Sequence, residues 1–310
     1  MSDRLAAGFK KRWRGLPGFT RGAILILCAT AISSMQMAQI KSMGSRLDTL
    51  QIGFFRFAAA LIVILPFVAK AGPAAFRTNH LKMHAARGTL SFCAQIFSFY
   101  AIIHLTLAQA TALSFTKSLF MVPLAILVLG ETVGWRRALA TVTGFLGVLV
   151  MIRPGYAELS LAVLAGLIGP FFVADSVVVA RKLAHREQPV TILFYFGVVT
   201  TTVSLGPALY VWQSPTWFDL FQAFTIGVSG LLLQRCLIGA YQVTEASAVA
   251  PLDYTRLLFA AAVGFTLFGE IPDPWTWVGA AIIAGSSIYI ARRETKLARH
   301  RPPPPPEDAI

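Results

Sequence analysis

Long apolar stretches recur along the whole chain, and only short polar segments separate them. A helix of about 20 apolar residues is long enough to cross the hydrocarbon core of a bilayer. The pattern therefore predicts an all-α polytopic membrane protein with ten transmembrane helices. The expected spans are 22–40, 49–69, 86–104, 106–129, 135–152, 159–180, 189–212, 218–241, 246–268 and 274–291.

Composition agrees with this class. Of the 310 residues, 56% are hydrophobic and 13% are charged, whereas a soluble domain carries about 25% charged residues. The three cysteines lie inside apolar stretches with spacing that fits no metal or redox motif. All histidines, His84 among them, are expected in loops or tails. Without a catalytic, phosphate-binding or metal motif, the sequence indicates neither an enzyme, nor a metal site, nor a cofactor.

The basic residues predict the orientation. If the N-terminus is cytoplasmic, twenty Lys and Arg residues fall in cytoplasmic loops and tails and three fall on the opposite side. Because cytoplasmic loops carry an excess of Lys and Arg, we expect both termini inside. The net charge of +13 is then explained by contact with the anionic leaflet of the lipid bilayer, without a nucleic acid partner.

The chain contains an internal duplication. When it is shifted against itself by 139 residues, one offset aligns three consecutive helices. Five spans in each half are an odd number, so the second half enters the membrane inverted, as in many secondary carriers. The matched positions include Phe55 with Phe194, Gln95 with Gln234, Leu113 with Leu252, Thr116 with Thr255, and Gly130-Glu131 with Gly269-Glu270.

The duplication gives the domain organisation. We expect a first five-helix repeat at 22–152 and a second at 159–291. A basic cytoplasmic tail, 1–21, precedes them, and a basic, proline-rich and disordered tail, 292–310, follows.

Charged residues inside the expected spans are the candidate substrate-binding groups. A charge at the bilayer centre costs roughly 2.5–3.5 kcal/mol on insertion scales, so it usually faces a protein interior or a watery cavity. Lys117 and Arg256 occupy matching positions of the two halves. Asp253 lies three residues before Arg256 and shares its helix face. The other candidates are Arg56, Asp175, Arg235, Gln95, Gln234, Tyr195 and Tyr254.

Structural explanations remain open for each candidate. Ion pairs such as Asp253 with Arg256, or Asp175 with Arg235, can lock helices together. Lys117 has no acidic residue one turn away, so it either snorkels towards the interface or pairs with another helix or the ligand. The glutamines can bond helix to helix, and the tyrosines can simply pack.

The sequence resembles the drug/metabolite transporter superfamily, and within it the ten-helix EamA-type carriers. The resemblance covers roughly 20–295 and lies in the entries to spans four and nine, Thr111–Lys117 and Ala250–Arg256. It extends to the Gly-Glu endings at Glu131 and Glu270 and to the glycine-bearing helices after them (Gly144, Gly147, Gly279 and Gly285). Ser118 departs from the family, since many relatives place a proline there; this leaves the position of a helix break in span four open, Pro123 being nearest.

The resemblance implies a carrier for amino acids, vitamins, nucleotide-related metabolites or drugs. Lys117 and Arg256 are similar to a subset of alphaproteobacterial carriers described as S-adenosylmethionine or riboflavin transporters. We expect a multi-pass secondary transporter of the bacterial inner (plasma) membrane that moves a small polar or amphipathic, anionic or zwitterionic metabolite by alternating access. Helices one to four rock against six to nine, while five and ten brace the halves or form a homodimer. The alternative is a non-transporting membrane protein, either a lipid-handling enzyme or a structural subunit.

Overall fold

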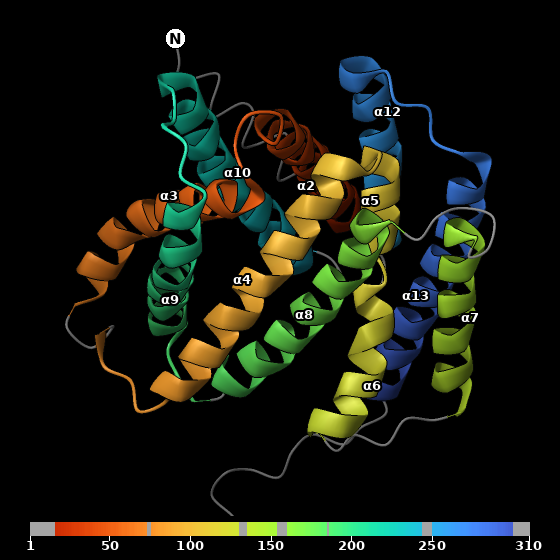
Figure 1. The fold of residues 1–310 in the computed structure, drawn as a ribbon. Coiled ribbons are helices and arrows are strands. Elements are labelled where there is room, and N and C mark those ends of the chain that lie inside the picture. Colours follow the sequence, from red (N-terminus) through yellow and green to blue (C-terminus); the bar gives the residue numbers. More distant parts are fainter. Residues whose placement is uncertain are drawn as a thin grey trace, which may run out of the picture.

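The structure is a computed structural model that describes residues 16–72, 76–129, 135–153, 160–184, 186–243 and 250–299. Every regular element in these ranges is helical (Figure 1), which confirms the all-α prediction. The helices are α2 (Gly18–Met43), α3 (Thr49–Ala71), α4 (Leu81–His104), α5 (Leu107–Ser114), α6 (Lys117–Leu129), α7 (Trp135–Ile152), α8 (Leu161–Ala184), α9 (Pro189–Tyr210), α10 (Trp217–Val243), the 3₁₀-helix η2 (Ala250–Thr255), α12 (Arg256–Phe268) and α13 (Pro274–Arg299).

The described part of the chain contains seven helices that are long and apolar enough to cross a membrane. One of them is the stretch Leu107–Val128, which comprises α5 and α6; α7 adds a shorter apolar helix, Ala138–Ile152. A multi-pass membrane protein is therefore confirmed, and the count of ten spans stays a prediction. α13 runs on to Arg299, beyond the expected span end at 291, because Ala, Arg, Glu, Lys and Leu there are good helix formers.

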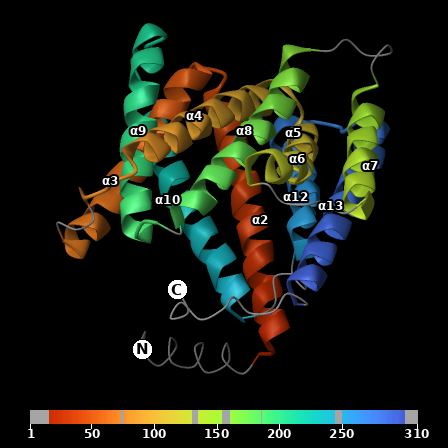
Figure 2. The same ribbon diagram turned by 90° about the horizontal axis from the view of Figure 1, so that it is seen from below.

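Packing partners exchange between the two halves (Figures 1 and 2). α4 packs on α8, and its repeat counterpart α10 packs on α2; likewise α6 packs on α8, and α12 packs on α2. The pairs α3–α9 and α7–α13 each join repeat counterparts and lie at opposite sides of the bundle. Exchanging the halves therefore reproduces the main helix contacts, as a pseudo-two-fold axis requires.

The exchange extends to single hydrogen bonds. Gln36 Nε2 on α2 donates to the carbonyl of Ile226 on α10 over 2.9 Å. Ser176 Oγ on α8 donates to the carbonyl of Arg87 on α4 over 3.4 Å. Ile226 and Arg87 are 139 positions apart, so matching carbonyls accept a bond from the first helix of the other half.

The fourth helix of each half changes its hydrogen bonding at the same position, where α5 gives way to α6 and the 3₁₀-helix η2 gives way to α12; these two points are the helix breaks. Thr116 Oγ1 donates to the carbonyl of Leu113 over 2.6 Å, and Thr255 Oγ1 donates to the carbonyl of Leu252 over 2.6 Å. Around Thr116 the backbone bonds span three residues rather than four. The first break therefore falls just before Lys117, whereas Pro123 sits inside α6 without ending it.

α7 and α13 approach each other at backbone distance. A Cβ added to Gly279 would lie 2.6 Å from the carbonyl oxygen of Gly147 and 2.6 Å from Cβ of Met151. Glycine at position 279 thus permits this close helix contact, of the kind common between membrane helices.

Three ion pairs of the described residues gather at the end of the bundle where α2, α7 and α12 finish and α10 and α13 begin, hereafter the Lys41 end. They are Lys41 with Glu270, Arg46 with Asp219 (2.9 Å), and Arg153 with Asp273 (2.5 Å). Gln51 on α3 completes this end, because it donates to the carbonyl of Gln213 over 2.6 Å and accepts from its N–H over 3.1 Å.

Candidate functional site

Lys117 and Arg256 are the first residues of α6 and α12, directly after the two helix breaks. Arg256 Nη2 donates to Ser114 Oγ on α5 over 2.8 Å. Its guanidinium carbon also lies 5.1 Å from the centroid of the Phe115 ring, a cation–π distance. The Tyr254 ring packs on the same Phe115 ring, with centroids 4.7 Å apart. Arg256 thus joins the second half of the chain to the break in the first.

The Lys117 side chain is exposed, although the nearby residues Thr116 and Leu119 are both completely buried. Lys117 begins α6, and Arg256 begins α12 at the matching position of the second half. Within the described part of the chain, Lys117 makes no ion pair or hydrogen bond through its ammonium group. An ammonium group in this position is available to a ligand.

Asp253 does not form the ion pair that the sequence indicated. It is half-buried, and among the described residues no ion pair joins it to Arg256. Arg256 reaches away from η2 towards α5, where Ser114 accepts its hydrogen bond and Phe115 supplies a π face. Within the described residues, the Asp253 carboxylate is therefore not engaged in an ion pair.

Two hydroxyl groups on α2 hold the η2–α12 junction, and the sequence reasoning missed both. Thr30 Oγ1 lies 3.5 Å from Thr255 Oγ1, and Ser34 Oγ donates to the carbonyl of Arg256 over 3.4 Å. Both α2 residues are buried. Their signal in the sequence is slight, a pair of hydroxyls one turn apart in an apolar helix.

Arg56 and Gln95 form a second polar group between α3 and α4. Arg56 Nη1 donates to Gln95 Oε1 over 2.7 Å, and Gln95 Nε2 donates to the carbonyl of Gly53 over 3.2 Å. The Arg56 guanidinium lies 5.5 Å from the Phe99 ring centroid. Both bonds join α4 to α3, as expected if Gln95 serves to bond one helix to another. The side chain of its repeat partner Gln234 lies outside the described residues.

Tyr195 lies at the opposite end from the Lys41 end. Its ring stacks on His84 at 4.8 Å, and its hydroxyl donates to the carbonyl of Phe76 over 2.9 Å. His84 corrects the sequence expectation, since it belongs to α4 and is 1% exposed rather than lying in a loop. The Tyr195 ring packs on His84, so Tyr195 is occupied with this contact.

Asp175 on α8 is half-buried and Arg235 on α10 is exposed. Among the described residues no ion pair joins them. The structure thus gathers Lys117, Asp253, Tyr254 and Arg256 at the helix breaks and places Arg56 with Gln95 between α3 and α4. Glu131, the repeat partner of Glu270, lies outside the described residues.

This fold, two helical repeats with charged side chains at paired helix breaks, defines a class of membrane carriers. The model of the EamA-like transporter family matches the chain twice, over residues 20–153 and 160–292. The chain belongs to this family, and the two matches are the two copies of the duplication.

Similar proteins include several transporters. The chain is 32% identical over 281 residues to the S-adenosylmethionine uptake transporter of Rickettsia prowazekii, covering 91% of this chain and 96% of that protein. It is 31% identical over 287 residues to the riboflavin transporter of Vibrio cholerae, covering 90% and 95%. A pseudopaline exporter of Pseudomonas aeruginosa is 29% identical over 273 residues, covering 87% and 96%.

A solved structure shares the fold. It superposes with a TM-score of 0.58 at 17% identity, covering 92% of this chain and 99% of the other. The family and its named relatives are transporters, so the protein is a metabolite transporter and not an enzyme.

Proposed function

We propose that this protein is a secondary transporter that moves a small amphipathic metabolite with an anionic group across a bacterial inner membrane by alternating access. The observation that carries the proposal is Lys117, an exposed cation at a helix break that makes no ion pair among the described residues. Membrane cations of this kind are costly unless a ligand or a cavity uses them. The relatives named as metabolite transporters support the same function.

The residues around Lys117 indicate the chemistry of the substrate. Lys117 binds a carboxylate or phosphate, which relieves its repulsion with Arg256. The free carboxylate of Asp253 accepts a cationic group, so a zwitterion suits the site. Phe115 and Tyr254 present aromatic rings to a flat moiety. An amphoteric compound with a ring satisfies all of these groups together.

Repeat symmetry supports alternating access. The helix contacts and the helix breaks recur in both halves, and inverted repeats give two related states when the halves exchange conformations. With both termini cytoplasmic, as the Lys and Arg distribution predicts, the Lys41 end faces the outside. The pairing of α7 with α13 supports their role as a brace.

Contacts between the broken helices indicate which state the structure represents. α5 of the first half packs on α12 of the second half, towards the Lys41 end. The broken helices therefore meet on the side of Lys117 that faces the Lys41 end. In the proposed orientation this is a state closed to the outside.

Binding and transport assays test the proposal. Purified protein is screened by thermal shift against amphoteric ring compounds, matched neutral analogues and free amino acids, because a ligand stabilises the fold by mass action. Compounds that raise Tm are then tested for counterflow in proteoliposomes. We expect an anionic or zwitterionic compound to bind and to move, and its neutral analogue to do neither. Chemical conversion of compound or lipid without net movement would instead favour the lipid-handling enzyme.

A further inference from the structure

Lys41 and Glu270 form a polar node where four helix ends meet. The Glu270 carboxylate pairs with Lys41 through Oε1 and accepts the backbone N–H of Leu107 through Oε2 over 2.7 Å. Lys41 Nζ also donates to the carbonyl of Leu105 over 2.5 Å. The node therefore joins the end of α2, the link between α4 and α5, and the end of α12.

The turn at the end of α12 positions the Glu270 carboxylate. α12 ends on Gly269, whose φ of 65° is the left-handed conformation that favours glycine. This turn brings Glu270 back over Gly264, where an added Cβ would lie 2.6 Å from Oε2. Both side chains of the pair are largely shielded, with 17% of Lys41 and 11% of Glu270 exposed. Removing one partner of a shielded pair leaves the other charge uncompensated.

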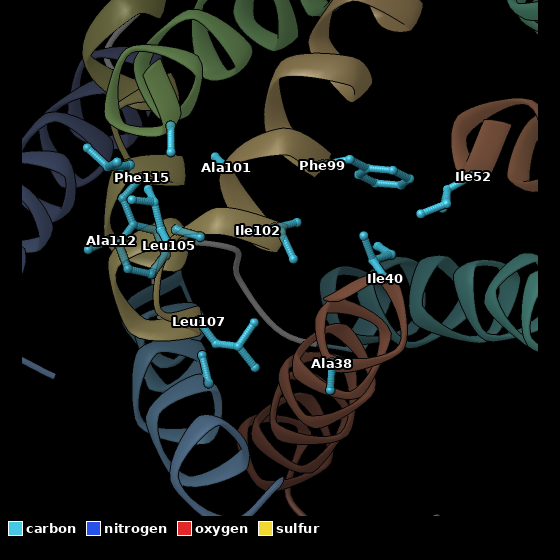
Figure 3. Close-up of a cluster of buried hydrophobic side chains, with 14 of the residues drawn as sticks. Ala38, Ile40, Ile52, Phe99, Ala101, Ile102, Leu105, Leu107, Ala112 and Phe115 are labelled. Carbon is cyan, nitrogen blue, oxygen red and sulfur yellow. The ribbon is translucent and has the colours of Figure 1, made fainter. Parts of the chain in front are cut away.

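An apolar layer lies directly beneath the node. Ile40 on α2, Ile102 on α4 and Leu107 on α5 are buried in one hydrophobic cluster, whose side chains converge from three helices in Figure 3. Lys117 follows Leu107 by ten positions along α5 and its break, or about 15 Å at the helical rise. This apolar layer thus lies between the Lys117 group and the node at the Lys41 end.

The described residues at the opposite end of the bundle make a different contact. Lys182 lies on α8, which packs on α6. This contact is the counterpart of the packing of α2 on α12 in the other half. Lys182 is exposed and donates to the carbonyl of Val128 over 3.2 Å. In the described ranges, all three ion pairs lie at the Lys41 end. Among the described residues, therefore, the ion pairs that join the two halves lie at the Lys41 end.

We propose that the Lys41–Glu270 pair is a latch that holds the Lys41 end closed over the substrate site and breaks in each transport cycle. The proposal rests on the proposed function, since a latch needs a cycle in which the end opens. Lys41 belongs to the first half and Glu270 to the second, so relative movement of the halves must separate them. Closed states contain the pair and open states lose it, so removing one partner shifts the population towards the open state.

Distance measurements between spin labels test the latch without reference to any substrate. Labels are attached at Ser42 on α2 and Ile271 after α12, both exposed, in a chain whose Cys28, Cys93 and Cys236 are replaced by alanine. Glu270→Gln keeps an oxygen for the Leu107 N–H while it removes the charge, and Lys41→Met removes the cation. We expect both variants to add a longer-distance population that the parent chain lacks, and the double variant to add no more than either one.

Asp273→Asn is the matched control, because it breaks the Arg153–Asp273 pair at the same end of the bundle without touching the node. Its distance distribution is expected to match that of the parent chain. Distributions that stay unchanged in Glu270→Gln and Lys41→Met, with Tm retained, would overturn the latch. An equal shift in all three variants would overturn it as well, since it would indicate general loosening. A shift confined to the node variants in a protein that moves no compound would support the latch as a closure and refute the proposed transport.

Discussion

Thr116 and Thr255 make the same hydrogen bond in the two halves of the chain. Each hydroxyl donates over 2.6 Å to the carbonyl three residues earlier, that of Leu113 or Leu252. Threonine that bonds back to its own helix competes with regular helical bonding and bends the helix. Each bend ends one residue before a cation, Lys117 or Arg256, so the same local device positions both charges.

Removing these hydroxyls should disturb the position of the cations. Thr116→Val and Thr255→Val keep the side-chain shape but lose the bond, which costs about 1 kcal/mol for each carbonyl left without it. We expect both variants to transport more slowly, by similar factors, with small decreases in Tm. Thr→Ser at each position keeps the hydroxyl and should retain most of the transport rate. Full activity of both valine variants would show that the hydroxyls do not position the charges.

The partner of Arg256 can be tested by two substitutions. The sequence alone suggests that Asp253→Asn strands Arg256 and harms folding. In the structure Arg256 donates a hydrogen bond to Ser114 and makes no ion pair with Asp253 among the described residues. Asp253→Asn should therefore leave Tm nearly unchanged, while it weakens binding of a cationic substrate group. Ser114→Ala should lower Tm by more, since it leaves a shielded donor without its acceptor. Thermal melts of the two purified variants decide between the assignments.

The close contact of α7 with α13 predicts a contrast between two glycines. Gly279→Ala places a methyl group against the Gly147 carbonyl and Met151, and such overpacking typically costs roughly 1–3 kcal/mol. Gly285→Ala on the same helix meets nothing within 4 Å and should not destabilise the protein. Melting temperatures of both variants test this, and equal values would mean that the helices are not held at backbone distance.

The orientation of the protein in the membrane can be measured by thiol labelling at two loop positions. In a chain without native cysteines, Ser45→Cys lies at the Lys41 end and Thr78→Cys lies at the other end, near Glu187. We expect an impermeant thiol reagent, added to intact cells, to label Ser45→Cys rapidly and to leave Thr78→Cys unlabelled. The reverse pattern would invert the topology and place the latch on the cytoplasmic side.

Much of the fold followed from the sequence because bilayer spans and repeats leave strong periodic signals. The expected positions of Lys117 and Arg256 correspond to paired places in the structure, since the offset of 139 residues also relates the helix breaks. The family resemblance inferred from the helix entries and the glycine-bearing helices is confirmed by the two matches to the family model.

The rest could not be predicted because side-chain partners depend on packing between distant helices. Three-residue spacing favoured Asp253 as the partner of Arg256, yet the side chain extends to Ser114, 142 positions away along the chain. Similarly, no local pattern links Lys41 with Glu270, or Thr30 with Thr255. In the sequence, Tyr195 is as good a candidate for the substrate site as Tyr254. The structure instead stacks its ring on His84 of the neighbouring helix α4.

The most direct test of the proposed site is the transport rate of Lys117→Gln. Uptake of the compound identified by thermal shift is measured in proteoliposomes, alongside the Tm of the variant and of Lys182→Gln, which makes the same change at an exposed lysine outside the site. We predict that Lys117→Gln keeps or raises Tm, because it removes an unpaired charge from the membrane interior, and that it abolishes uptake. Lys182→Gln should transport as the parent does. Normal uptake by Lys117→Gln would contradict the account, since the substrate would then be bound without this cation.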